Sequence, residues 1–273
     1  MRKYLFCAFF LLSFLCTSII NADLSTVQKQ EIEKAQDKIL NYIRLNKSRF
    51  RVEDLFLLDF LQRRFQITDE FSFRKTFTRL PNPQEKKSLE TYGRLVNYKG
   101  VRWKKPEKAE SFIWLELKAL FVEKQEDCPG KKELLIQLGN QAREQGYACT
   151  HSALALGWFM EQGCLSRDEK EVQQLRSFVI QRLLSESNTI QFPSDLKVEA
   201  LAFVCYLGGK KKINSKELLH ILPYQREDGA FSGTINPADG INVHTTLLVL
   251  WLTFEFLNEH TFYNEPMICP KEL

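Results

Sequence analysis

The sequence predicts an all-α protein, built of repeated helical hairpins that form an α/α solenoid or a partial toroid. Two observations carry this prediction. Segments with helical periodicity alternate between apolar character on one face and apolar character all round, and strand patterning is nowhere persuasive. A motif is also repeated: a polar turn with glycine and an aromatic residue precedes His-Ser or His-Thr and an apolar helix. Its two copies run over residues 141–160 and 225–257.

The N-terminus has the pattern of a secretory signal peptide over residues 1–22. A basic pair precedes an uncharged apolar run, and the small residue Ala22 stands at the end. This order is typical of a cleaved signal. The alternative is an uncleaved anchor, because the apolar run is at the short limit for a bilayer span. We expect cleavage, secretion and no membrane association of the mature chain.

Helices follow one another along the rest of the chain. Ser25 begins the first, because its hydroxyl can cap the helix and Gln28 can reach back to it. Outer helices are recognised by one apolar face, and inner helices are apolar almost all round. The expected helices are 25–45, 52–65, 85–96, 106–122, 131–144, 150–160, 168–185, 195–207, 215–222 and 242–257, and the inner ones are 150–160, 195–207 and 242–257.

A polar residue near the start of each inner helix recurs at intervals of 48 and 45 residues. Such a period predicts a solenoid or a closed ring, here one domain over 23–258 with an extended tail over 259–273. The inner-helix N-termini then converge on one mouth that suits an acidic or hydroxylated ligand. The alternative is that these polar residues are caps and satisfied core histidines. The predicted pocket residues are His151, Ser152, Glu199, Gln225, His244 and Thr245.

Removal of the signal peptide leaves 36 basic and 34 acidic side chains, so we expect no nucleic-acid partner. It also leaves an odd number of cysteines in an oxidising compartment, and an unpaired one could link a homodimer. Antiparallel packing of helices 131–144 and 150–160 brings Cys128 and Cys164 to the same end, which predicts a disulfide. The cysteine spacing fits no structural zinc site, so no metal or other cofactor is predicted. Asn46 begins the one glycosylation sequon.

Several of these motifs occur in an order that resembles an uncharacterised secreted animal protein family, known only by a chromosome-16 open-reading-frame label. They lie between Cys128 and Leu257 and include the turn 146–151, the run 219–231 and His244-Thr245. The resemblance implies a secreted helical protein that can form a homodimer, with no established activity. This chain lacks the long insert and the cysteine that the family carries before the helix that begins near His244.

A broader resemblance is to the α/α toroids of terpene cyclases and protein prenyltransferases. It is carried by Gln225-x-x-Asp228-Gly229-x-Phe231, like their repeat turn, and by Val243-His244-Thr245, like the segment with a prenyltransferase zinc histidine. The resemblance implies that the glutamine ties one helix end to the next. Those transferases also need Asp-x-Cys, and Asp195-Leu196-Lys197 has lysine in place of the thiolate. The acid cluster of a cyclase is absent as well, so neither zinc nor cyclase activity is expected.

Two functions fit the sequence. The favoured one is a secreted scaffold that binds a protein or small-molecule partner at the mouth, because the sequence shows no complete catalytic set. The alternative is a toroid enzyme, a hydrolase, lyase or transferase acting on a sugar or lipid. It would use His151 or His244 as general base and Glu199 or Asp228 as acid. The discriminating observation is whether these histidines and Glu199 share an open cavity and keep free hydrogen-bonding capacity.

Overall fold

A computed structural model describes residues 24–67, 95, 111–122, 125–234, 236, 238, 240–258 and 266–268. Every regular element in this part of the chain is a helix, as the sequence predicts. The predicted signal peptide, most of the expected helix 85–96 and Cys269 lie outside the described residues, as does most of the expected tail. A helix that could cross a bilayer is not found among the residues described.

The helix boundaries lie close to those expected from the apolar patterns. The largest difference is at α6, where the sequence predicts a helix over 106–122 and the described α-helix begins at Trp114, after a 3₁₀ turn over 111–113, and ends at Leu120. Helix α8 begins three residues earlier than expected, and α9 ends four residues later. The helices are α2 (Thr26–Asn46), α3 (Val52–Phe65), α6 (Trp114–Leu120), α7 (Lys131–Arg143), α8 (Tyr147–Glu161), α9 (Lys170–Thr189), α10 (Asp195–Tyr206), α11 (Ser215–Ile221) and α12 (Val243–Leu257).

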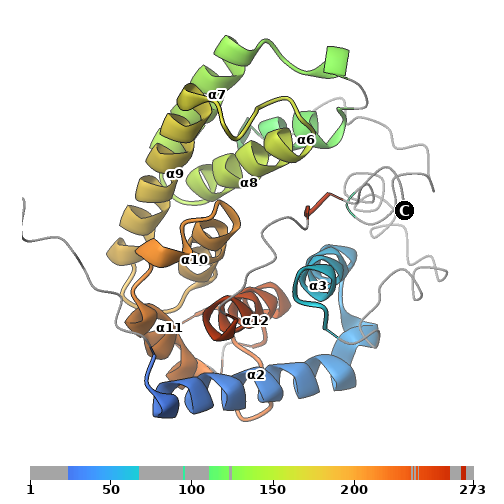
Figure 1. Cartoon of the computed structure of the whole chain (residues 1–273). Coiled ribbons are helices and arrows are strands. Elements are labelled where there is room, and N and C mark those ends of the chain that lie inside the picture. Colours follow the sequence, from blue (N-terminus) through green and yellow to red (C-terminus); the bar gives the residue numbers. More distant parts are fainter. Residues whose placement is uncertain are drawn as a thin grey trace, which may run out of the picture.

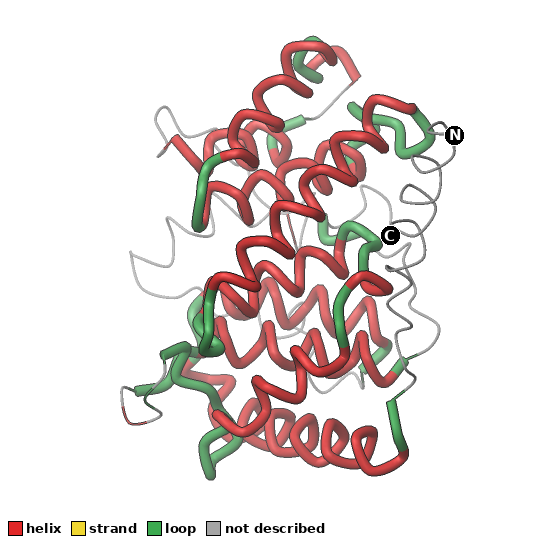
Figure 2. The backbone as a smooth tube through the Cα atoms, turned by 90° about the vertical axis from the view of Figure 1, so that its left-hand side faces the viewer, coloured by secondary structure: helices red, strands yellow, loops and turns green. Residues whose placement is uncertain are grey.

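The helices form an inner and an outer row along an arc (Figure 1). In the inner row α6 packs against α8, α8 against α10, α10 against α12, and α12 against α3. The outer helices α7, α9 and α2 cover this row, and Figure 2 shows the same helices stacked from the side. Burial separates the rows: nine of the 12 residues of α10 are buried, but only five of the 20 residues of α9. The solenoid or partial toroid stays a prediction.

Local sequence explains where α2 begins and how it is attached to the C-terminal half. Ser25 and Gln28 form the predicted capping box, with the Ser25 hydroxyl accepting from the Gln28 amide. Gln225, in the turn before α12, donates to the carbonyl oxygen of Ala35 at 2.9 Å and to that of Gly229 at 3.0 Å. Gly229 has a φ of 95°, and a Cβ there would lie 2.3 Å from the Lys38 carbonyl oxygen. Only glycine therefore permits this close approach.

The predicted disulfide between Cys128 and Cys164 is confirmed, with a Cα–Cα distance of 5.5 Å. It joins the segment before α7 to the segment after α8, where antiparallel packing brings the two ends together. A cross-link over this chain length stabilises the fold by about 3–4 kcal/mol in the chain-entropy description. Cys149 and Cys205 are free and buried.

Candidate functional site

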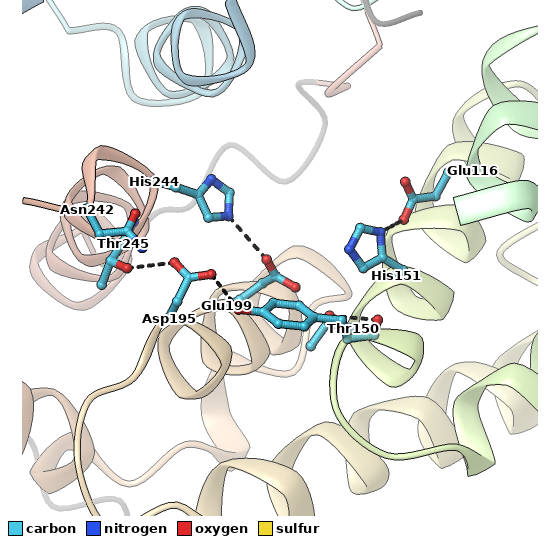
Figure 3. Close-up of polar contacts among 9 residues, drawn as sticks. Glu116, Thr150, His151, Asp195, Glu199, Asn242, His244 and Thr245 are labelled. Carbon is cyan, nitrogen blue, oxygen red and sulfur yellow. Dashed lines mark hydrogen bonds and ion pairs between the residues drawn. The ribbon is translucent and has the colours of Figure 1, made fainter. Parts of the chain in front are cut away.

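A cavity of about 410 Å³ is lined by residues from every inner helix. Its volume falls within the range of roughly 300–1,000 Å³ that is common for small-molecule sites. Figure 3 shows Glu116, His151, Asp195, Glu199 and His244, which line it from α6, α8, α10 and α12. The lining residues are Glu53, Phe56, Leu57, Leu95, Glu116, Tyr147, His151, Leu154, Trp158, Asp195, Glu199, Phe203, His244, Leu248 and Met267.

The cavity is polar at one end and apolar at the other because of how its lining residues are spaced along the helices. On α3, α8, α10 and α12 they recur at three or four residues, which places them on one face of each helix. The polar ones come first, near the helix N-terminus, and the apolar ones follow. They are Tyr147, His151, Leu154 and Trp158 on α8, Asp195, Glu199 and Phe203 on α10, and His244 and Leu248 on α12.

His244 and Glu199 form an ion pair across neighbouring inner helices. The Nε2 atom of His244 donates to Glu199 Oε2 at 3.1 Å. Burial alone would lower the pKa of His244, but the hydrogen bond and charge of Glu199 outweigh it and raise the pKa to about 9. Burial would likewise raise the pKa of Glu199, yet His244 holds it below its usual value. The pair is therefore ionised at neutral pH.

His151 and Glu116 form a second pair on the opposite side of the cavity. The Nδ1 atom of His151 contacts the carboxylate of Glu116, which is 1% exposed. Burial raises the pKa of Glu116, although His151 acts against it. Burial would lower the pKa of His151, but the Glu116 carboxylate reverses this and raises it. Both groups therefore hold a proton more firmly than they would in water.

Asp195 is fixed by two hydroxyl groups. Its Oδ1 accepts from Thr245 Oγ1 at 2.6 Å, and its Oδ2 accepts from the Tyr147 hydroxyl at 3.0 Å. Burial, followed by the Asp195 charge, raises the pKa of Tyr147, which therefore stays protonated and donates. Thr245 is itself positioned by Asn242, the N-cap of α12. These contacts tie the first turns of α8, α10 and α12 together.

Three ligand-type side chains converge at the polar end. One donor atom from each of Asp195, Glu199 and His244 lies within 4.8 Å of the others. Glu199 is 5% exposed, and its Oε1 has no hydrogen-bond partner among the described residues. The nearby Thr150 hydroxyl donates instead to the Tyr147 carbonyl at 3.1 Å. These three residues could hold a metal ion. Glu199 Oε1 could also accept a hydrogen bond from a ligand.

The structure brings His151, Glu199 and His244 together in the cavity but places the other predicted site residues elsewhere. Ser152 donates to the Leu138 carbonyl at 2.8 Å, because a residue that follows His151 on a helix faces away from it. Thr245 lies behind Asp195 and does not line the cavity. Asp228 accepts from the backbone of its own turn, and Gln225 bonds α2 as described above.

Four polar lining residues were not predicted as site residues: Glu53, Glu116, Tyr147 and Asp195. Two of them have a signal in the sequence. Asp195 precedes Glu199 by four residues and Tyr147 precedes His151 by four, so each pair shares one helix face. Glu116 has no such signal, because its partner comes from a different helix.

Comparison of the chain with known protein families, curated proteins and solved structures finds no match. The two resemblances drawn from its motifs therefore stay predictions.

Proposed function

We propose that this chain is a secreted helical scaffold that binds a hydroxylated amphiphile, such as a long-chain or polycyclic alcohol, in the cavity of its inner helices. The hydroxyl end lies among Asp195, Glu199 and His244, and the apolar body lies against Trp158 and Phe203. The disulfide supports an oxidising compartment, because such bonds persist mainly in secreted proteins.

The single observation that carries this proposal is an unpartnered oxygen of Glu199 in the wall of a cavity whose other end is apolar. A buried carboxylate oxygen without a donor costs about 1–3 kcal/mol or more, and a ligand hydroxyl would supply the missing hydrogen bond. The same ligand gains from the apolar end, where burial contributes about 25 cal/mol for each Å² of apolar surface. A carboxylate ligand fits less well, because Glu53, Glu116, Asp195 and Glu199 outnumber the two histidines.

General acid–base catalysis on a sugar or lipid is the second candidate function. It is favoured by the presence of two histidine–carboxylate pairs in one cavity, neither of which is used as a helix cap. One pair could remove a proton from a substrate while the other donates one. These two pairs are what supports the enzyme hypothesis.

Isothermal titration calorimetry with medium-chain n-alcohols and the matched fatty acids tests the binding function. We expect the alcohols to bind more tightly than the acids. The variant Leu154→Trp fills the cavity from a half-buried position on α8 and should abolish binding. The matched control Ile136→Trp lies on the exposed face of α7 and should leave it intact. Absence of alcohol binding, or equal binding by Leu154→Trp, would overturn the proposal.

Turnover separates the second candidate from the first. Hydrolysis of medium-chain p-nitrophenyl esters that His151→Gln and His244→Gln both abolish would support the enzyme. Binding of alcohols without such turnover would support the scaffold.

A further inference from the structure

We propose that Asp195, Glu199 and His244 form a binding site for one zinc ion at the polar end of the cavity. Asp195 and Glu199 stand four residues apart on α10, so both carboxylates leave the same face of that helix. His244 comes from the first turn of α12, which packs against α10. Figure 3 shows the three side chains near one another, with His244 and Glu199 in direct contact.

The distances require little rearrangement. Zinc binds nitrogen and oxygen donors at about 2.0–2.2 Å, so tetrahedral ligands lie about 3.3 Å from one another. His244 Nε2 and Glu199 Oε2 are already 3.1 Å apart. The three donor atoms lie within 4.8 Å of one another, which leaves a shift of the order of 1 Å for side-chain rotation. Zinc would replace the proton that His244 now shares with Glu199.

The surroundings of Asp195 have the form expected around a metal ligand. Hydroxyl groups of Tyr147 and Thr245 each donate to one of its oxygens. Each oxygen keeps a lone pair, and the two hydrogen bonds hold the carboxylate toward the cavity. Such contacts orient ligands and raise metal affinity, typically by 10–100-fold.

A second observation is the other oxygen of Glu199: the residue is 5% exposed, and its Oε1 has no partner in the described part of the chain. Two carboxylates face one histidine here, and a divalent cation would offset their excess negative charge. The sequence predicted no metal because its cysteines lack the spacing of a structural zinc site and Lys197 occupies the position of a thiolate. The Lys197 ammonium donates to the Ile190 carbonyl at 3.0 Å and pairs with Glu217 instead. Glu199 supplies the third donor in its place.

Three protein ligands leave a fourth position for water or for an oxygen of a cavity ligand, which is the arrangement of zinc sites that do chemistry. The donor set of two carboxylates and one imidazole contains no thiolate, so it suits zinc better than copper(I). The inference does not depend on the alcohol proposed above, although a bound alcohol oxygen would lie next to the metal.

The test is metal binding by the purified protein, prepared without a polyhistidine tag and stripped with EDTA. We expect calorimetry to show one zinc ion per chain, with magnesium binding far more weakly. Cobalt(II) should give the intense visible absorption of a tetrahedral site. His244→Ala, Asp195→Asn and Glu199→Gln should each weaken zinc binding by about 10-fold or more. The control His220→Ala, an exposed histidine on α11, should leave it unchanged.

Tyr147→Phe removes only a hydroxyl that supports Asp195 and should weaken zinc binding by about 10-fold. This variant keeps the test valid if a ligand variant fails to fold. Wild-type protein without stoichiometric zinc or a tetrahedral cobalt spectrum would overturn the proposal, as would binding that none of these variants alters. Leu154→Trp separates the two proposals, because it should block alcohol binding and leave zinc binding intact.

Discussion

Helix α12 takes part in an ion pair near each end, and only the pair near its C-terminus is fully buried. Near its C-terminus, Glu255 Oε1 accepts from Arg64 at 2.7 and 3.0 Å and from Trp251 Nε1 at 3.0 Å. The Arg64 guanidinium also lies 5.6–5.9 Å from the centroids of the Phe60, Phe65 and Trp251 rings. Near its N-terminus, His244 pairs with Glu199 at the edge of the cavity, and the His244 side chain is 33% exposed.

The difference lies in what adjoins each pair. Glu255 Oε2 also has no partner among the described residues, so an unpartnered oxygen does not by itself mark a site. Glu255, however, does not line the cavity, whereas Glu199 does and stands beside two further donors. The Arg64–Glu255 pair therefore holds α3 against α12, and the Glu199–His244 pair is available to a ligand.

The largest expected effect is the loss of stability when the Arg64–Glu255 pair is broken. Glu255→Gln removes the carboxylate that faces the buried Arg64 guanidinium, which should lower the free energy of unfolding by about 3–5 kcal/mol. Glu199→Gln should cost about 1 kcal/mol or less, because water reaches its histidine partner. Urea unfolding of the metal-free proteins at neutral pH measures both changes.

A double variant sharpens this prediction. Arg64→Met combined with Glu255→Leu replaces the Arg64–Glu255 pair with apolar side chains and should restore most of the lost stability. Equal losses for Glu255→Gln and Glu199→Gln would show that the two pairs do not differ in the way described.

The sequence predicted the buried inner helices better than the site that they surround. Helices α8, α10 and α12 are apolar almost all round, and such segments are buried whatever their neighbours are. His151, Glu199 and His244 were found because each follows the start of an inner helix. Asp195 could have been found in the same way, since it lies one helical turn before Glu199.

The rest of the site depends on contacts between distant segments. Glu116 is separated from His151 by 35 residues, and only the packing of α6 on α8 joins them. Ser152 was predicted as a pocket residue because it stands beside His151 in the sequence. The helical twist of about 100° per residue turns it toward α7 instead. Adjacency in the sequence is therefore a poor guide to a shared cavity on helices.

The second prediction concerns the apolar end of the cavity, which Met267 lines from the C-terminal segment. Glu161, at the end of α8, accepts from the backbone amides of Met267 and Ile268 at 2.9 and 3.0 Å. Glu161→Gln weakens these bonds and should lower the free energy of unfolding by about 1–3 kcal/mol. Hydrogen exchange at the two amides should become faster. The control Glu171→Gln, at an exposed site, should change neither the stability nor the exchange rates. Unchanged exchange in Glu161→Gln would show that Glu161 does not hold the C-terminal segment.

The smallest expected effect is the pH dependence of the stability that the Glu199–His244 pair contributes. The pKa of His244 is about 9 in the folded chain and about 6.5 in the unfolded chain, so folding favours its protonated form. Its stabilising contribution is complete below pH 6.5 and is lost as the pH rises to about 9. The effect is modest because the side chain is 33% exposed and water screens the pair.

Urea unfolding of metal-free protein across this pH range should show that stability falls as the pH rises, and that it falls less steeply in His244→Gln. His151 titrates in the same direction and should account for the remaining slope. His220→Gln, on the exposed face of α11, should keep the full slope, and an identical slope in His244→Gln would mean that Glu199 gains nothing from its histidine partner.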